Sequence, residues 1–301
     1  MGSMIGISVI VPCYNQSKYL AECIQSLQAQ AYLNWECIIV NDGSTDETES
    51  IASNLVKGDE RVKYIKKGNG GLSSARNAGL KVSEGEYIQF LDADDVIGEN
   101  KFDEAITAFD QNSCDLVISN FQCTTKNLEE ILPSYCDLKG VNFSYESILL
   151  EWDKRYTIPI HCGIFKRSLL HDFHFNENLK AKEDWIMWLH IFKLTNRFVF
   201  IDKPHAKYRL HGNGLTNDAL HMYTNTVKAF RYINNQLEEK YKFDFLKKTN
   251  EYWEEKIIEL DQFKKDLMAS RSYKLSSGIV RIYALIYKKF FNVRHANSNH
   301  S

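Results

Sequence analysis

The 301-residue sequence has no long hydrophobic run, and this absence argues against a membrane-spanning protein. No stretch approaches the roughly 18 uncharged apolar residues that a transmembrane helix needs. The N-terminus enters a predicted strand without the basic region and cleavage site of a signal peptide. We therefore expect a cytoplasmic protein. The composition, 44% hydrophobic and 25% charged residues, also excludes disordered and collagen-like chains.

The sequence also lacks C-x-x-C pairs, although it contains seven cysteines. Their number is odd, and several fall in apolar runs. This pattern predicts reduced thiols in a cytosol rather than a disulfide framework. His161-Cys162 and His171-x-x-His174 match no standard zinc-finger spacing, so structural zinc is not predicted.

Two common nucleotide-binding motifs are missing. The turn after the first predicted strand contains no glycine, so the dinucleotide fingerprint G-x-G-x-x-G is absent there. No G-x-x-x-x-G-K-[ST] occurs anywhere in the chain. These absences argue against a dinucleotide-binding Rossmann domain and against a P-loop enzyme.

What the sequence does contain, from residue 7 to about 120, is an alternation of short apolar runs with helix-period segments. This alternation predicts βαβ units and a mostly parallel α/β sheet. Ser44 and Glu47 have capping-box spacing, which predicts a helix over about 46–56. The predicted strands are 7–13, 36–41, 62–66, about 86–95 and 114–120.

The second half of the chain is less regular. Residues 185–194 are strongly apolar and predict a helix, followed by a pair of strands, 197–202 and 205–210, around Pro204. Beyond about residue 220 an apolar stripe on a Lys/Glu-rich background predicts a long amphipathic helix.

The C-terminal tail is basic. Residues 271–301 contain six lysines and arginines and no acid. Within the tail, 279–293 predicts a basic amphipathic helix, which could contact an anionic membrane surface peripherally, pack on the domain, or form a homodimer with a second subunit. No groove-reading motif accompanies this charge, so nucleic acid is not an expected partner.

Polar residues follow each predicted strand, where parallel α/β sheets bind their ligands. Asp92 and Asp94 lie at the end of the fourth predicted strand, with Asp95 directly behind. Three neighbouring carboxylates repel one another unless a cation lies between them, and their oxygens suit Mn²⁺ or Mg²⁺ bridging to a diphosphate. The alternative is that Asp94 and Asp95 only cap the next helix.

Six motifs now stand in order: V-I-V-P-C-Y-N, V-N-D-G-S-T-D-E-T, G-G-L-S-S-A-R-N-A-G, F-L-D-A-D-D, K-E-D-W and Y-R-L-H. Together they closely resemble the family 2 glycosyltransferases of the GT-A fold, over roughly residues 5–215. The resemblance implies a GT-A catalytic domain over 1–218, with a nucleotide-binding half (about 5–120) and an acceptor half (about 121–218). A helical extension over 219–301 would follow.

The resemblance also implies roles for the matching residues. Asp42 would contact the uracil, and Asp92 would bind the ribose or the metal. Asp94 would hold the divalent cation, Mn²⁺ or Mg²⁺, with Asp92 and His211 as further ligands. The donor-binding residues would be Pro12, Tyr14, Asn15, Asp42, Gly71, Ser73, Arg76, Asp92 and Ala93.

By the same resemblance, Asp184 would be the catalytic base, with Glu183 beside it. Inversion needs a carboxylate that takes the proton of the acceptor hydroxyl. The alternative for this acid pair is an ordinary acidic helix start.

The function implied is inverting transfer of a hexose or N-acetylhexosamine from a UDP-sugar to a saccharide or lipid-linked acceptor in surface polysaccharide synthesis. The enzyme would be cytoplasmic or peripheral on the inner face of the membrane. A sugar nucleotidyltransferase and a non-catalytic nucleotide-sugar binding or scaffold module are the alternatives.

Overall fold

The computed structural model describes residues 5–211 and 218–269. A single sheet dominates them, with strands in the order β3-β2-β1-β4-β8-β6-β9-β5 and β7 paired with β6. Strands β1 to β4 are parallel neighbours, whereas β8 runs antiparallel to both β4 and β6. The strands are β1 (Ile7–Cys13), β2 (Trp35–Asn41), β3 (Val62–Lys66), β4 (Tyr87–Phe90), β5 (Val96–Ile97), β6 (Leu116–Thr125), β7 (Ile131–Leu132), β8 (Gly163–Lys166) and β9 (Phe198–Leu210).

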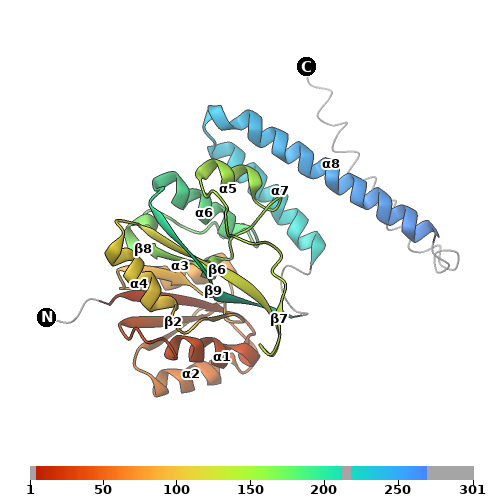
Figure 1. The fold of residues 1–301 in the computed structure, drawn as a ribbon. Coiled ribbons are helices and arrows are strands. Elements are labelled where there is room, and N and C mark those ends of the chain that lie inside the picture. The colour runs from red at the N-terminus through yellow and green to blue at the C-terminus, as the bar shows by residue number, and fades with distance from the viewer. Residues whose placement is uncertain (1–4, 212–217, 270–301) are drawn as a thin grey trace. The chain divides into compact units, whose positions relative to one another are not determined.

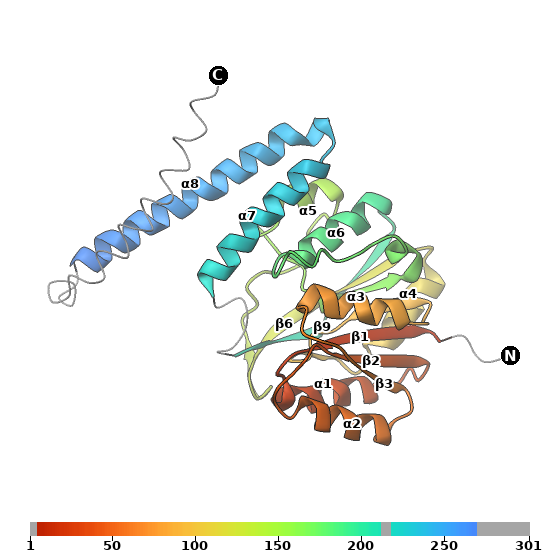
Figure 2. The same ribbon diagram turned by 180° about the vertical axis from the view of Figure 1, so that it is seen from behind.

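Helices cover both faces of the parallel part of the sheet. The helices are α1 (Ser17–Gln28), α2 (Thr48–Gly58), α3 (Leu72–Val82), α4 (Lys101–Gln111), α5 (Tyr145–Glu151), α6 (Glu183–Leu194), α7 (Ala219–Gln236) and α8 (Glu239–Ala269). Figures 1 and 2 show α1 and α2 on one face and α3 on the other. Every residue of β1 and β2 is therefore buried, as expected for parallel strands between two helical layers.

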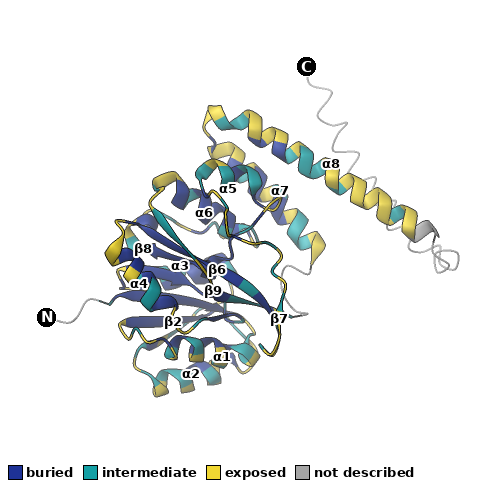
Figure 3. Ribbon diagram, viewed as in Figure 1, coloured by how far each residue is buried: buried dark blue, intermediate teal, exposed yellow. Residues whose placement is uncertain are grey.

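Alternate residues of β1 supply the two halves of the core. Val9 and Val11 pack with Leu20 and Ile24 of α1 in one cluster. Ile10 points to the opposite face, where Gly79 lets α3 approach closely. The central strands are accordingly the darkest part of Figure 3.

The cysteines behave as predicted. All seven lie among the described residues and are free thiols: Cys13, Cys23, Cys37, Cys114, Cys123, Cys136 and Cys162. Among residues 5–211 and 218–269, no helix combines the length and apolar character needed to cross a bilayer.

The predicted strand pair around Pro204 is wrong, because β9 is one strand. It runs parallel to β6 with register shifts on either side of Asn120, which pairs with Pro204. Proline has no N–H to give to a ladder, so Asp202 and Lys203 bulge out and the strand continues beyond them. The fourth strand is shorter than predicted: it ends at Phe90, which leaves the acidic residues in a turn.

The predicted capping box is wrong as well. The Ser44 hydroxyl accepts a hydrogen bond from Asn15 N at 2.9 Å and does not cap α2. The N-cap residue of α2, Glu47, makes no side-chain cap bond; one position earlier, Asp46 Oδ1 accepts from Thr48 N at 3.1 Å and Oδ2 from Ser17 N at 3.0 Å. One carboxylate thus fixes the beginnings of both α1 and α2.

The chain divides into two compact units, Met1–Glu238 and Glu239–Ser301. The first extends beyond residue 218, the boundary expected from the sequence, because α7 packs on α6 through a 5.9 Å contact between the Phe230 and Trp185 rings. In the second unit α8 is a helix of 31 residues. The tail segment 279–293 lies outside the described residues.

Candidate active site

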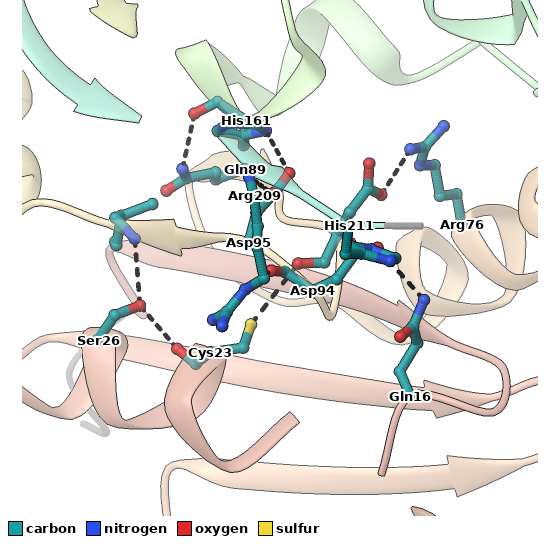
Figure 4. A network of polar contacts seen from close by, with 12 residues as sticks. Gln16, Cys23, Ser26, Arg76, Gln89, Asp94, Asp95, His161, Arg209 and His211 are labelled. Carbon is teal, nitrogen blue, oxygen red and sulfur yellow. Dashed lines mark hydrogen bonds and ion pairs between the residues drawn. The ribbon is translucent and has the colours of Figure 1, made fainter. Parts of the chain in front are cut away.

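The acidic turn after β4 distributes its three carboxylates among different partners. Asp94 Oδ2 lies 2.9 Å from His211 Nε2, directly after β9, and accepts from Gln16 Nε2 at 3.2 Å. Asp95 Oδ1 accepts from Arg209 N at 2.8 Å. Figure 4 shows Asp94 and Asp95 turned to these separate partners. Each of the two carboxylates thus has hydrogen-bond partners of its own.

Asp94 and His211 form the part of this turn that suits a divalent cation. Their side chains are 22% and 5% exposed, so the pair borders on solvent. The Tyr19 ring lies against the His211 ring, with centroids 5.0 Å apart. The Asp94 carboxylate fits Mn²⁺ or Mg²⁺ when phosphate oxygens and water supply most of the remaining ligands, with the His211 imidazole next to it.

Asp92, the third predicted metal ligand, has a different partner. Its Oδ1 accepts from Arg76 at 2.7 Å, and the other arm of the same guanidinium donates to Glu183 Oε1 at 2.6 Å. No group of three or more His, Cys, Asp or Glu side chains suited to a metal occurs in the described part of the chain. The structure therefore brings together Asp94 and His211, but not the predicted trio.

Arg76 is the most deeply buried charge of the site, at 1% exposure. Burial alone would lower its pKa, but the carboxylates of Asp92 and Glu183 raise the pKa above its ordinary value. The sequence placed this arginine on the nucleotide. The structure places it in a bridge between the turn after β4 and the start of α6, which we call the Arg76 bridge.

The acid pair opens α6. Lys182, just before it, has a left-handed backbone with φ 67°, and Trp185 N donates to Asp184 Oδ1 at 2.8 Å. Burial, and then the neighbouring Glu183 carboxylate, raise the pKa of Asp184 to about 7. Because Glu183 is committed to Arg76, Asp184 is the better candidate for a general base, whose pKa should lie near the working pH.

The predicted nucleotide side is organised around Asp42. Its carboxylate accepts from Gly71 N at 2.6 Å, from Gly70 N at 3.0 Å and from Lys67 Nζ at 2.6 Å. Gly71 has φ 90°, a conformation that favours glycine. Asp42 thus shapes the glycine-rich loop, and its contact with uracil stays a prediction. Next to this loop, Lys180 Nζ donates to Gly70 O at 2.8 Å.

The other predicted donor residues lie at different depths. Asn15 joins the turns after β1 and β2, since its Oδ1 accepts from Thr45 N at 2.8 Å. Tyr14 is 48% exposed, which leaves its ring accessible for stacking. Pro12 and Ala93 are buried in the core. Of these residues, Tyr14 and Asn15 therefore offer the accessible surface.

Sequence reasoning missed two supports of the acidic turn. Arg209 Nε donates to Asp94 O at 2.6 Å. Arg209 belongs to the motif Y-R-L-H, and its place in that motif could have indicated a role at the site. His161, considered above in connection with zinc, lies with Nδ1 3.3 Å from Asp95 Oδ2. Burial lowers the pKa of His161 to about 3, and burial with the Asp94 and Asp92 charges raises the pKa of Asp95. No local sequence pattern predicts the contact between His161 and Asp95.

Solved structures place this architecture in a known class. The chain is similar to Staphylococcus aureus TarS 1–349 in complex with UDP-GlcNAc, with a TM-score of 0.62 and 26% identity over 80% of this chain and 70% of that one. A Pyrobaculum calidifontis mannosyltransferase in complex with GDP-Man and Mn²⁺ shares the fold, with a TM-score of 0.58 and 16% identity over 89% and 81% of the two chains. The predicted GT-A fold with C-terminal helices is confirmed.

Sequence comparison identifies the family. The model of glycosyl transferase family 2 matches residues 8–173, more than half of the chain, and the chain belongs to this family. It is 32% identical over 215 residues to Bacillus subtilis EpsJ, named an uncharacterized glycosyltransferase, covering 70% of this chain and 62% of EpsJ. It is 35% identical over 215 residues to the B. subtilis minor teichoic acid biosynthesis protein GgaB, covering 69% of this chain and 23% of GgaB. The chain thus spans only part of each relative.

Proposed function

We propose that the protein is an inverting, metal-dependent glycosyltransferase that moves a hexose or N-acetylhexosamine from a UDP-sugar to a saccharide or lipid-linked saccharide. The Arg76 bridge carries this proposal. It ties the turn that holds Asp94 to the helix start that holds Asp184, so a donor-binding loop and a base share one rigid support. UDP as the nucleotide is supported by TarS, a relative of 26% identity in complex with UDP-GlcNAc.

In the proposed mechanism, Asp184 accepts the proton of the acceptor hydroxyl while the acceptor oxygen bonds to the anomeric carbon. The bond from that carbon to the diphosphate breaks on the opposite side, and UDP leaves with the electron pair. Asp94 and His211 would hold the divalent cation, which would supply positive charge to neutralise the departing diphosphate. Arg76 keeps Asp92 and Glu183 in place.

Further parts of the proposal concern the cellular setting. We propose surface polysaccharide synthesis, because the relative GgaB is named for teichoic acid biosynthesis. We also keep the predictions of peripheral contact with the inner face of the membrane through 279–293 and of a homodimer through the C-terminal helices. Sedimentation with anionic vesicles, and light scattering of the full chain, test these two points separately.

The test of function begins with calorimetry of the full chain against UDP, GDP, TDP and CMP, each with Mn²⁺ and with excess EDTA. Selective UDP binding that is lost in EDTA is expected. UDP release from UDP-glucose, UDP-galactose, UDP-GlcNAc and UDP-GalNAc then identifies the donor. Binding without any release favours the scaffold alternative, and formation of a UDP-sugar from UTP and a sugar phosphate favours the nucleotidyltransferase.

A further inference from the structure

The backbone just before the acid pair lies outside the helices and strands, and α6 satisfies only the Lys182 carbonyl, which accepts from Ile186 N at 3.4 Å. We call Leu179–Lys182 the 179–182 segment; it has no regular secondary structure and ends in the left-handed Lys182. A non-glycine residue keeps that conformation only where its surroundings hold it. Whatever holds this segment therefore decides where Glu183 and Asp184 lie.

Side chains from two helices hold it. Ser73 of α3 donates its hydroxyl to Leu179 O at 3.2 Å. Asn225 Oδ1 of α7 accepts from Lys180 N at 2.9 Å, and His221 Nε2 lies 3.2 Å from Lys180 O. His221 Nε2 also lies 3.4 Å from Asn225 Nδ2, so the imidazole contacts both the segment and the amide that holds it.

Asn225 is the fixed point of this arrangement. It is 3% exposed, and its Nδ2 donates to His221 O at 2.9 Å, so both ends of the amide are engaged. The helix itself is anchored one residue beyond the acid pair, where Phe230 packs edge-on against Trp185. The amide of Asn225 thus approaches the 179–182 segment from a firmly packed helix.

We propose that Asn225 is a positioning residue for glycosyl transfer, which acts through Lys180 on the orientation of the acid pair. The inference rests on the proposed function, in which Asp184 is the base. It makes α7 part of the catalytic unit, although α7 lies outside the family match at 8–173 and outside the domain expected from the sequence.

Two substitutions at Asn225 and one control test this proposal in the full chain. N225A removes the acceptor for Lys180 N. N225D keeps an oxygen acceptor for Lys180 N, but its second oxygen faces His221 O, to which the amide donates in the wild type. The control T226V removes a buried hydroxyl of the same helix whose contact, Met222 O at 2.9 Å, is within α7.

The first readout is kinetic, using UDP release from whichever of the four UDP-sugars the wild type turns over. A base displaced by about 1 Å can slow a reaction on the order of a hundredfold. We expect N225A to lower kcat by about 10- to 100-fold with the donor KM within about threefold, and N225D, which keeps the acceptor but loses the donor, to fall between N225A and the wild type. Equal kcat in N225A and T226V would overturn the proposal.

The second readout is amide hydrogen exchange over residues 179–184, which needs no turnover. N225A should speed exchange of these amides, and T226V should not. If wild-type protein releases no UDP from any donor with water as the only acceptor, the exchange result alone decides whether Asn225 holds the segment. Unchanged exchange in N225A refutes the inference whatever the activity.

Discussion

Replacing Arg76 by methionine should destabilise the protein far more than removing a surface charge. The guanidinium is 2% exposed at its side chain and compensates two carboxylates, Glu183 at 6% and Asp92 at 29% exposure. Methionine fills a similar volume but leaves both acids without their counter-charge. The substitution therefore isolates the electrostatic part of the Arg76 bridge.

The magnitude follows from burial. Removing one partner of a buried ion pair typically costs about 3–5 kcal/mol, because the remaining charge is left uncompensated. Most of this cost falls on Glu183, since water reaches Asp92. For a domain of this size, that loss corresponds to a fall in Tm of roughly 6–20 °C. R155M, which removes an exposed pair with Glu151, should cost under about 1 kcal/mol.

Urea unfolding followed by tryptophan fluorescence measures these differences. In the R76M background, E183Q removes the uncompensated charge and should restore about 1–3 kcal/mol of the loss. The double-mutant cycle with E183Q alone then gives the coupling between the two residues. A loss below 1 kcal/mol for R76M, or no recovery with E183Q, would refute the view that this bridge supports the site.

Three more predictions concern the base, the metal pair and the fold. With the pKa of Asp184 at about 7, the base is protonated at lower pH, so kcat should fall about tenfold per pH unit below 7, and a flat profile of kcat from pH 5 to 8 contradicts this. The variant D184N should retain UDP binding without transfer. D94A and H211A should each abolish the Mn²⁺-dependent part of UDP binding in calorimetry, and unchanged affinity in both would exclude the pair as ligands. G79A should cost about 1–3 kcal/mol in urea unfolding, because its Cβ would collide with the Ile10 side chain; G58A, with no atom near its Cβ, is the control.

The sequence was sufficient to predict most of the fold over residues 5–120, because its signals there are local. Apolar runs of strand length marked β1 and β3 to the residue. The polar turn at Asp92 follows directly from the end of such a run. Parallel strands bring their carboxyl ends to one edge, so the position of the acidic turn could be deduced without a structure.

The partners of these residues could not be predicted, since they depend on chain segments far apart. Arg76 and Glu183 are 107 residues apart, and nothing in either neighbourhood specifies the pairing. Ser44 has the spacing of a helix cap, yet Asn15 takes its hydroxyl from 29 residues away. Local chemistry predicts which groups need a partner, and tertiary packing decides which partner they find.

The three carboxylates of the acidic turn after β4 depend on partners from distant parts of the chain. Asp92 depends on α3, Asp94 on the end of β9, and Asp95 on His161 and Arg209. Elements from across the first unit must therefore be in place before the turn is fixed.

We expect donor binding to disappear together with global structure rather than before it. Ligand that binds only the folded state stabilises it by RT ln(1 + [L]/Kd), so the urea midpoint should rise with UDP and Mn²⁺ at constant m. Mutations in β9 remote from the donor, such as those at the Pro204 bulge, should lower stability and leave the affinity of the folded protein unchanged. If urea below the unfolding transition abolished UDP binding while tryptophan fluorescence stayed native, the site would unfold separately from the rest of the domain. The cooperative assembly argued from these four carboxylate contacts would then be wrong.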